Sequence, residues 1–137
     1  MHAAASALAV ALLVLALGGS AEATPRAETR RLVNRERADV GCDPIAASRY
    51  ALRKARAHSR EMAAAGELFH SDLAGETGWT RIGEVIGVDD RWASIVRALF
   101  ASPEHRRVLL DCRYAVGAFG FVFAGGTVWL TGRLYAR

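Results

Sequence analysis

The stretch that decides the fold is residues 114–135, YAVGAFGFVFAGGTVWLTGRLY, at the C-terminal end of the chain. Two runs rich in aromatic and β-branched residues flank Ala124-Gly125-Gly126, and glycine pairs of this kind favour a tight turn between strands. The pattern therefore predicts an antiparallel hairpin with strands at 114–123 and 127–135.

The chain before this hairpin is mainly helical in its apolar spacing. Four segments are predicted to be helices, namely residues 28–38, 48–65, 91–101 and a segment that opens at Ser102-Pro103. Ser102 is expected to be the N-cap and Pro103 the first helical residue of the last of these. Residues 67–81 have the mixed, glycine-containing composition of a loop, and residues 82–88 are predicted to form a short strand. Helices first and a hairpin last predict an α+β domain with helices packed on a small, mainly antiparallel sheet.

Residues 1–23 have the composition of a secretory signal peptide. The apolar run at 7–17 is broken by Gly18-Gly19-Ser20, and Ala21-Glu22-Ala23 then supplies a small-x-small cleavage site. The run is shorter than the roughly 20 residues that a membrane-spanning helix needs. We expect cleavage after Ala23, a single domain at 24–137, and a secreted, extracellular protein with no transmembrane span. An uncleaved membrane anchor is the alternative.

Charge and cysteine content fit an exported protein. The formal net charge is +4, and the basic residues are spread along the chain, which favours anionic neighbours such as wall polymers or lipid headgroups. The sequence contains no nucleic-acid motif, so nucleic acid is not a predicted partner. The two cysteines, Cys42 and Cys112, are predicted to form a disulfide, because a lone pair in an oxidising compartment usually bridges.

Three short islands carry the residues that could perform acid/base or metal chemistry: His70 in Leu68-Phe69-His70-Ser71, Glu84 in Gly83-Glu84-Val85-Ile86, and His105 in Ser102-Pro103-Glu104-His105-Arg106. Two neutral imidazoles and a carboxylate can hold Zn²⁺ or another divalent cation with a water in the fourth position. Such a site would lower the pKa of that water and could support hydrolysis. No HExxH motif and no Ser-His-Asp set accompanies it. The alternative is structural, in which the same side chains bond to each other and to loop amides.

Taken in order, these islands and their neighbours resemble the short, secreted bacterial branch of the CAP superfamily, whose modules are also called SCP domains. The resemblance rests on six motifs: Asn34 with Arg37 and Gly41-Cys42-Asp43-Pro44-Ile45, Leu52 with His58-Ser59 and Met62, Phe69-His70-Ser71, Gly83-Glu84, Ser102-Pro103 with His105-Arg106, and Val116-Gly117. It implies a three-layer α-β-α sandwich and a surface cleft with two His and two acidic residues, where some members bind zinc. His70, Glu84 and His105 match three of the four. Ser102 stands in the place of the second acid, and Val85 replaces an Asn.

The resemblance implies two kinds of function. The first is a non-catalytic binding module for a lipid, a small amphipathic molecule or an anionic cell-wall component, with a His/Glu/His cleft that is a candidate divalent-metal site. The alternative is a metal-dependent extracellular hydrolase that uses the same three residues as catalytic ligands. The missing second acid favours binding. His58, in the middle of the long predicted helix, is expected to be structural, and Trp79 is expected to line the cleft or to lie exposed.

Overall fold

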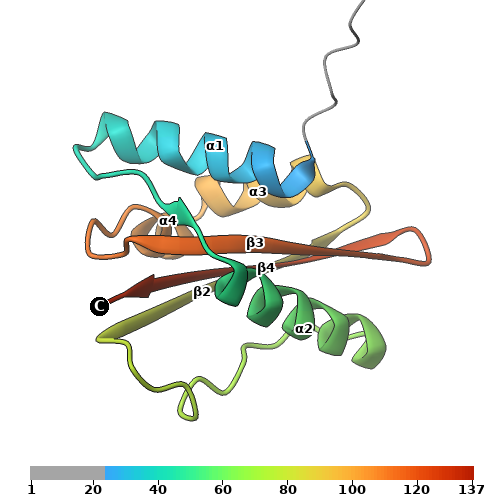
Figure 1. The fold of residues 1–137 in the computed structure, drawn as a ribbon. Coiled ribbons are helices and arrows are strands. Elements are labelled where there is room, and N and C mark those ends of the chain that lie inside the picture. The colour runs from blue at the N-terminus through green and yellow to red at the C-terminus, as the bar shows by residue number, and fades with distance from the viewer. Residues whose placement is uncertain (1–23) are drawn as a thin grey trace, which may run out of the picture.

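The computed structural model describes residues 24–137, and the predicted signal segment at 1–23 lies outside this part of the chain. Helices and strands alternate along the first part of this sequence, after which two helices and then two strands follow one another (Figure 1). The elements are α1 (Pro25–Asp39), β1 (Ala46–Ala47), α2 (Arg49–Ala65), β2 (Arg81–Asp89), α3 (Trp92–Ala101), α4 (Pro103–Leu109), β3 (Val116–Ala124) and β4 (Thr127–Ala136). None of the helices described is long and apolar enough to cross a membrane.

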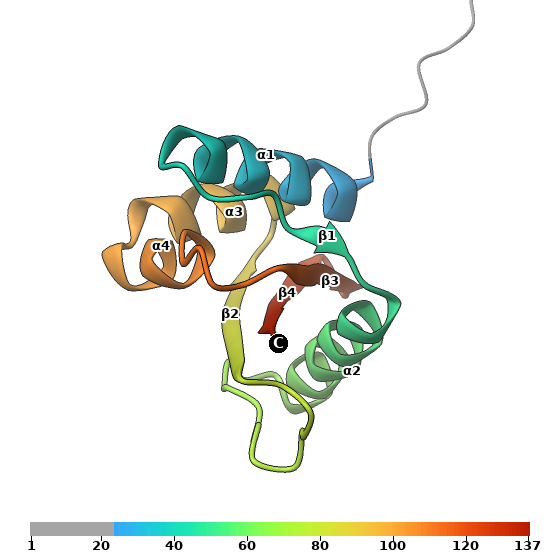
Figure 2. The same ribbon diagram turned by 60° about the vertical axis from the view of Figure 1, so that its left-hand side comes forward.

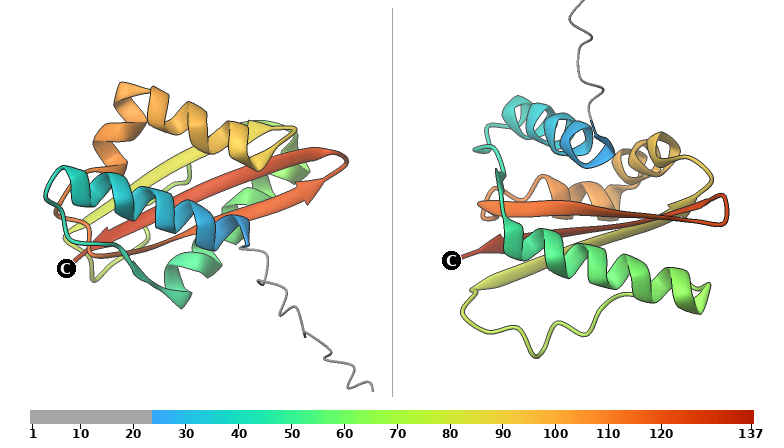
Figure 3. Two further views of the ribbon diagram at one scale, coloured as in Figure 1. Left: turned by 90° about the horizontal axis from the view of Figure 1, so that it is seen from above. Right: turned by 45° about the vertical axis from the view of Figure 1, so that its right-hand side comes forward.

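The sheet is built around the predicted hairpin. Its strand order is β1-β3-β4-β2; β4 pairs antiparallel with both β3 and β2, and the two residues of β1 add in parallel to the start of β3. Helix α2 covers one face, and α1, α3 and α4 lie on the other (Figures 2 and 3). The predicted α+β class and the three-layer α-β-α arrangement are confirmed.

Helix α2 lies unusually close to the hairpin. A Cβ built on Gly120 of β3 would lie 2.5 Å from the backbone nitrogen of Arg56, so the absence of a side chain allows this approach. Ser59 of α2 donates a hydrogen bond to the Gly120 carbonyl at 2.9 Å and shares another with Thr131 of β4 at 2.8 Å. These contacts fix the position of α2, which carries one wall of the candidate site.

The start of α1 differs from the prediction, whereas the start of α4 agrees with it. Helix α1 begins at Pro25, three residues before the predicted start, and Thr24 is its N-cap, with the side-chain oxygen accepting from the amide of Ala27 at 3.3 Å. Ser102 is the N-cap residue of α4 and Pro103 its first helical residue, as predicted, although the Ser102 side chain makes no capping hydrogen bond. The two-residue strand β1 was not predicted, because so short a segment leaves no periodic pattern.

A buried arginine and the disulfide join the end of α1 to the segment after α4. Arg37 is fully buried, and burial lowers its pKa. Its guanidinium donates to four backbone carbonyls, those of Asp43, Leu109, Asp111 and Tyr114, at 2.8 to 3.0 Å. The Cys42–Cys112 disulfide, confirmed by the structure, links the same two segments.

Candidate functional site

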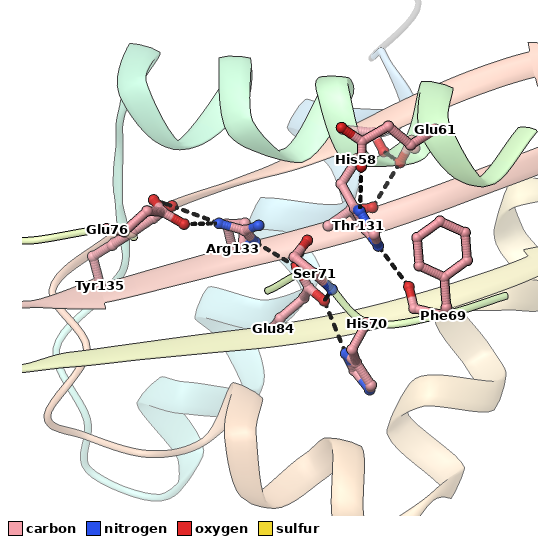
Figure 4. Close-up of polar contacts among 12 residues, drawn as sticks. His58, Glu61, Phe69, His70, Ser71, Glu76, Glu84, Thr131, Arg133 and Tyr135 are labelled. Carbon is pink, nitrogen blue, oxygen red and sulfur yellow. Dashed lines mark hydrogen bonds and ion pairs between the residues drawn. The ribbon is translucent and has the colours of Figure 1, made fainter. Parts of the chain in front are cut away.

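Glu84 and His70 meet at the centre of the candidate site, as Figure 4 shows. Glu84 lies in β2, directly opposite Arg133 of β4, and its side chain is 2 % exposed. His70 belongs to the loop between α2 and β2, and its side chain is 61 % exposed. The Glu84 Oε1 atom lies 2.9 Å from Nδ1 of His70. A buried carboxylate therefore holds an imidazole that faces solvent.

Both oxygens of Glu84 accept hydrogen bonds from several directions. Oε1 accepts from the Ser71 amide at 2.9 Å, and Oε2 accepts from the Ser71 hydroxyl at 2.6 Å and from Nε of Arg133 at 2.5 Å. Burial by itself would raise the pKa of Glu84, but the hydrogen bonds from Ser71, Arg133 and His70 outweigh it and hold the pKa below its ordinary value. Glu84 is therefore an ionised carboxylate, and most of its hydrogen-bond acceptor positions are already occupied.

This arrangement assigns the tautomer of His70. An ionised carboxylate can only accept, so a neutral His70 carries its proton on Nδ1 and keeps the lone pair on Nε2. The exposed side of the ring then presents Nε2. That atom can accept a hydrogen bond or serve as a ligand, while Glu84 fixes the ring's orientation.

Arg133 extends the network to a second carboxylate. Its Nη1 donates to Glu76 at 2.5 Å, and Glu76 also accepts from the hydroxyls of Tyr50 at 2.7 Å and Tyr135 at 2.9 Å. Burial raises the pKa of Glu76, yet hydrogen bonds from Tyr50, Tyr135 and Arg133 bring it below its ordinary value. Because Glu76 lies in the same loop as His70, this network holds the loop against the sheet.

His58 supports the other end of the loop. It is 2 % exposed, its Nε2 donates to the Phe69 carbonyl at 2.6 Å, and its ring meets the Phe69 ring edge-on. Its Nδ1 lies 3.2 Å from a carboxylate oxygen of Glu61. The predicted structural role of His58 is confirmed.

A polar groove of about 480 Å³ runs between α2 and the 67–80 loop. We call it the His70 groove. Most of its lining side chains are polar or charged; they are Lys54, His58, Glu61, His70, Ser71, Asp72, Glu76 and Arg133, with Phe69 among the few apolar ones. The lining carries groups of both signs, with Lys54 and Arg133 positive and Glu61, Asp72 and Glu76 negative.

The family model described as "CAP: Cysteine-rich secretory protein family" matches residues 30–132, which is most of the chain. The chain belongs to the CAP family. No curated protein matches the sequence.

Solved structures show the same fold at low sequence identity. An extracellular protein containing an SCP domain from Bacillus anthracis str. Ames is 18 % identical with a TM-score of 0.72; the match covers 82 % of this chain but 40 % of that one. This CAP chain therefore spans less than half the length of that relative. An outer surface protein from Borrelia burgdorferi is 12 % identical with a TM-score of 0.70, covering 79 % of this chain and 89 % of that one. Schistosoma mansoni venom allergen-like protein 4 is 7 % identical with a TM-score of 0.62, covering 80 % and 84 %.

His105, the third predicted member of the CAP site, has no described contact with the other two. It lies half-buried in α4, outside the lining of the His70 groove, and its buried Nδ1 has no hydrogen-bond partner within residues 24–137. In the same part of the chain, no three His, Cys, Asp or Glu side chains are grouped so that they could hold a metal ion. The structure brings His70 and Glu84 together, and the three-ligand set stays a prediction.

Three residues that complete the site were not predicted. Ser71 belongs to the Phe69-His70-Ser71 motif but was given no role, and Glu76 lies in a part of the loop whose composition carries no signal for particular contacts. The sequence does carry a signal for Arg133, because a lone arginine within an apolar strand needs a buried partner. Trp79 lies outside the lining of the groove; its ring packs on Tyr50 and Tyr135 under the Arg137 guanidinium.

Proposed function

We propose that this CAP chain is an extracellular, non-catalytic binding module that takes a polar cell-wall component in the His70 groove. The observation that carries the proposal is the pairing of Glu84 with His70. It leaves an oriented, exposed Nε2 at the groove while the carboxylate itself is buried and fully engaged. A rigid imidazole acceptor of this kind suits recognition of a hydroxyl or amide donor.

The lining of the groove favours a polar ligand over an acyl chain. Its mixed charges, which include Lys54, Glu61 and Asp72, would lose hydration against a lipid tail without gaining partners. A sugar or short peptide offers hydroxyl, amide and charged groups that can satisfy them, and the partly exposed Phe69 ring offers an apolar face. Among the predicted ligands, a wall-derived saccharide or peptide therefore fits better than a lipid or another amphipathic molecule.

Extracellular placement is part of the same proposal. The disulfide is of a kind that persists in oxidising compartments, and a structural relative from Bacillus anthracis is described as extracellular. Cleavage after Ala23 and release of the 24–137 domain follow from the sequence pattern alone.

Titration of soluble muropeptides into the exported protein tests the ligand class. We expect one-to-one binding that His70→Ala weakens at least tenfold, since this change removes the oriented acceptor, while Leu68→Ala in the same loop has little effect. Leu68 is a suitable control because it is exposed and lies outside the groove lining. If the protein binds a fluorescent fatty acid but no muropeptide, the proposal of a polar ligand is rejected. If the wild type and His70→Ala bind muropeptides equally well, the His70 groove is rejected as the binding site.

The donor set does not fit the metal-dependent hydrolase as the residues stand. A cation ligated by Glu84 would have to displace hydrogen bonds from Ser71 or Arg133, and the guanidinium of Arg133 would repel it. Calorimetric titration of Zn²⁺ into the metal-stripped protein tests this: micromolar one-to-one binding lost in His70→Ala/His105→Ala would restore the metal site and the hydrolase hypothesis.

A further inference from the structure

A second groove lies on the opposite side of α2, along the open edge of the sheet. Strand β1 pairs with β3 at Val116 and Gly117, and beyond that point no described strand pairs with this edge of β3. Figure 1 shows β3 at this edge, with α1 on one side and α2 on the other. The edge strand thus lies between two helices.

Two adjoining cavities lie along this edge and are lined by residues of α1, α2 and β3, and a third lies beside them on α2 alone; together we call them the β3-edge groove. The first, of about 420 Å³, and the second, of about 220 Å³, share Thr24, Arg26 and Phe119. The third, of about 370 Å³ on α2, shares Arg49 with the first and Arg56 with the second. None of their lining residues also lines the His70 groove, so the two sites are separate.

The β3-edge groove is strongly basic. Six arginines line it, two from α1 and four from α2: Arg26, Arg30, Arg49, Arg53, Arg56 and Arg60. No acidic residue lines any of the three cavities, and within residues 24–137 none of the six lies within ion-pair distance of a carboxylate. The cluster is therefore not neutralised from within the described chain.

Spacing on α2 arranges four of these charges in a row. Intervals of four, three and four residues from Arg49 to Arg60 place them on one helix face. With a rise of 1.5 Å per residue, the row extends about 16 Å. Such a row spans several repeats of a charged polymer, whereas a single small anion would use one or two arginines.

Apolar side chains accompany the charges. Phe119 lies at the floor, and Phe121 and Phe123 stack with their ring centroids 6.5 Å apart. Phe123 is 62 % exposed. Phe119 is buried, so a ligand chain with carbon-bearing repeats could cover the Phe121 and Phe123 rings while its charges face the arginines.

We propose that the β3-edge groove binds a linear polyanion of sugar or polyol repeats that carries phosphate or carboxylate groups, as found in anionic wall polymers. The concave shape favours a single chain over a flat membrane, because arginines on both walls can surround a chain. Cleavage after Ala23 would add an α-ammonium group at Thr24, which lines two of the cavities. This site is separate from the His70 groove and shares only the extracellular placement with the proposed function above, so it does not depend on what the His70 groove binds.

Calorimetric titration of sodium polygalacturonate and sodium polyphosphate at 50 to 200 mM NaCl tests the proposal with the exported protein. Since each arginine contact releases about 0.7 counterion from a flexible polyanion, six contacts predict a fall in affinity on the order of 100-fold or more over this range. We expect Arg49→Gln/Arg56→Gln/Arg60→Gln to weaken binding at least about tenfold and to reduce the log–log salt slope by about 2.

The matched control removes the same charge elsewhere. Arg35, Arg97 and Arg107 are exposed and line none of the three cavities, so their triple Gln variant should keep the salt slope and most of the affinity. Equal losses of polyanion affinity in both triple variants would mean that binding depends only on the net charge of the protein, and this would overturn the site. The proposed ligand class would be overturned if the protein bound phosphatidylglycerol vesicles but neither polymer. It would also be overturned if an oligo(dT) of equal charge bound more tightly than the polymers. Muropeptide binding at the His70 groove should be unchanged in both variants.

Discussion

Oε1 of Glu84 lies 2.9 Å from Nδ1 of His70, so a carboxylate buried in β2 orients an imidazole in the exposed loop. The same carboxylate is anchored by Arg133 from the adjacent strand. The orientation of the exposed ring is thus set by the sheet, although the ring itself belongs to a loop. This relationship gives His70 a fixed geometry before any ligand arrives, which lowers the entropic cost of binding.

The tautomer of His70 should depend on Glu84. In the wild type we expect the neutral ring to carry its proton on Nδ1, because ionised Glu84 accepts from that atom. Glu84→Gln replaces the carboxylate with an amide that can also donate, so the preference should weaken. Two-dimensional nitrogen NMR of the histidine ring reports both states, and a predominantly Nε2–H wild-type ring would contradict the assignment.

Arg133 should be the most sensitive charged residue of the site. Its side chain is 4 % exposed and contacts Glu84 and Glu76, which are themselves buried. Arg133→Met would leave two carboxylates without their cation, and we expect a loss of about 3–5 kcal/mol in the free energy of unfolding. Urea denaturation measures it, with the exposed Arg91→Met as a control expected to lie within about 0.5 kcal/mol of wild type. A loss below about 1 kcal/mol would show that the network contributes little.

Much of the architecture could be predicted because its signals are local. The turn at Gly125-Gly126 and the apolar spacing of the helices lie within single segments. The Thr24-Pro25 start of α1 follows the same pattern as Ser102-Pro103 and could have been found. The contacts of Glu84 could not be predicted from the sequence, because its pairing with Arg133 depends on the register of β2 with β4, and the two residues lie 49 positions apart in the chain. Position in the family motif predicted His105 as a third site member, but position alone does not supply a contact.

Acid should destabilise the fold through Glu84 and Glu76. Both have a folded-state pKa below the ordinary value of 4.5, so each stabilises the fold at neutral pH, and this contribution is lost as the pH falls from about 4.5 through the lowered pKa. Urea denaturation from pH 7 to pH 3 should show stability falling below about pH 4.5. Glu84→Gln should be less stable at pH 7 but should lose less on acidification; an unchanged acid slope in this variant would exclude Glu84 as a cause.

His105 should tolerate an apolar substitution. Its Nδ1 is buried without a hydrogen-bond partner in the described residues, and an unsatisfied polar atom contributes unfavourably to folding. His105→Leu should therefore change the free energy of unfolding by less than about 1 kcal/mol, or stabilise the protein. A loss of several kcal/mol would mean that the ring has a partner or ligand essential to the fold.

Gly120 should set the distance between α2 and the hairpin. An added Cβ would lie 2.5 Å from the Arg56 nitrogen and 2.6 Å from the carbonyl carbon of Ala55, both backbone atoms that cannot rotate away. Gly120→Ala should therefore displace α2 and cost about 1–3 kcal/mol, the usual range for overpacking. Gly75→Ala is the control, since an added Cβ there meets nothing within 4 Å and its φ is not positive. Because α2 forms a wall of both grooves, muropeptide and polyanion binding should both weaken in Gly120→Ala. Gly75 lines the His70 groove, so Gly75→Ala serves as the control for stability and for polyanion binding, both of which should stay unchanged. Retention of both kinds of binding in Gly120→Ala would show that the grooves tolerate a shift of the helix.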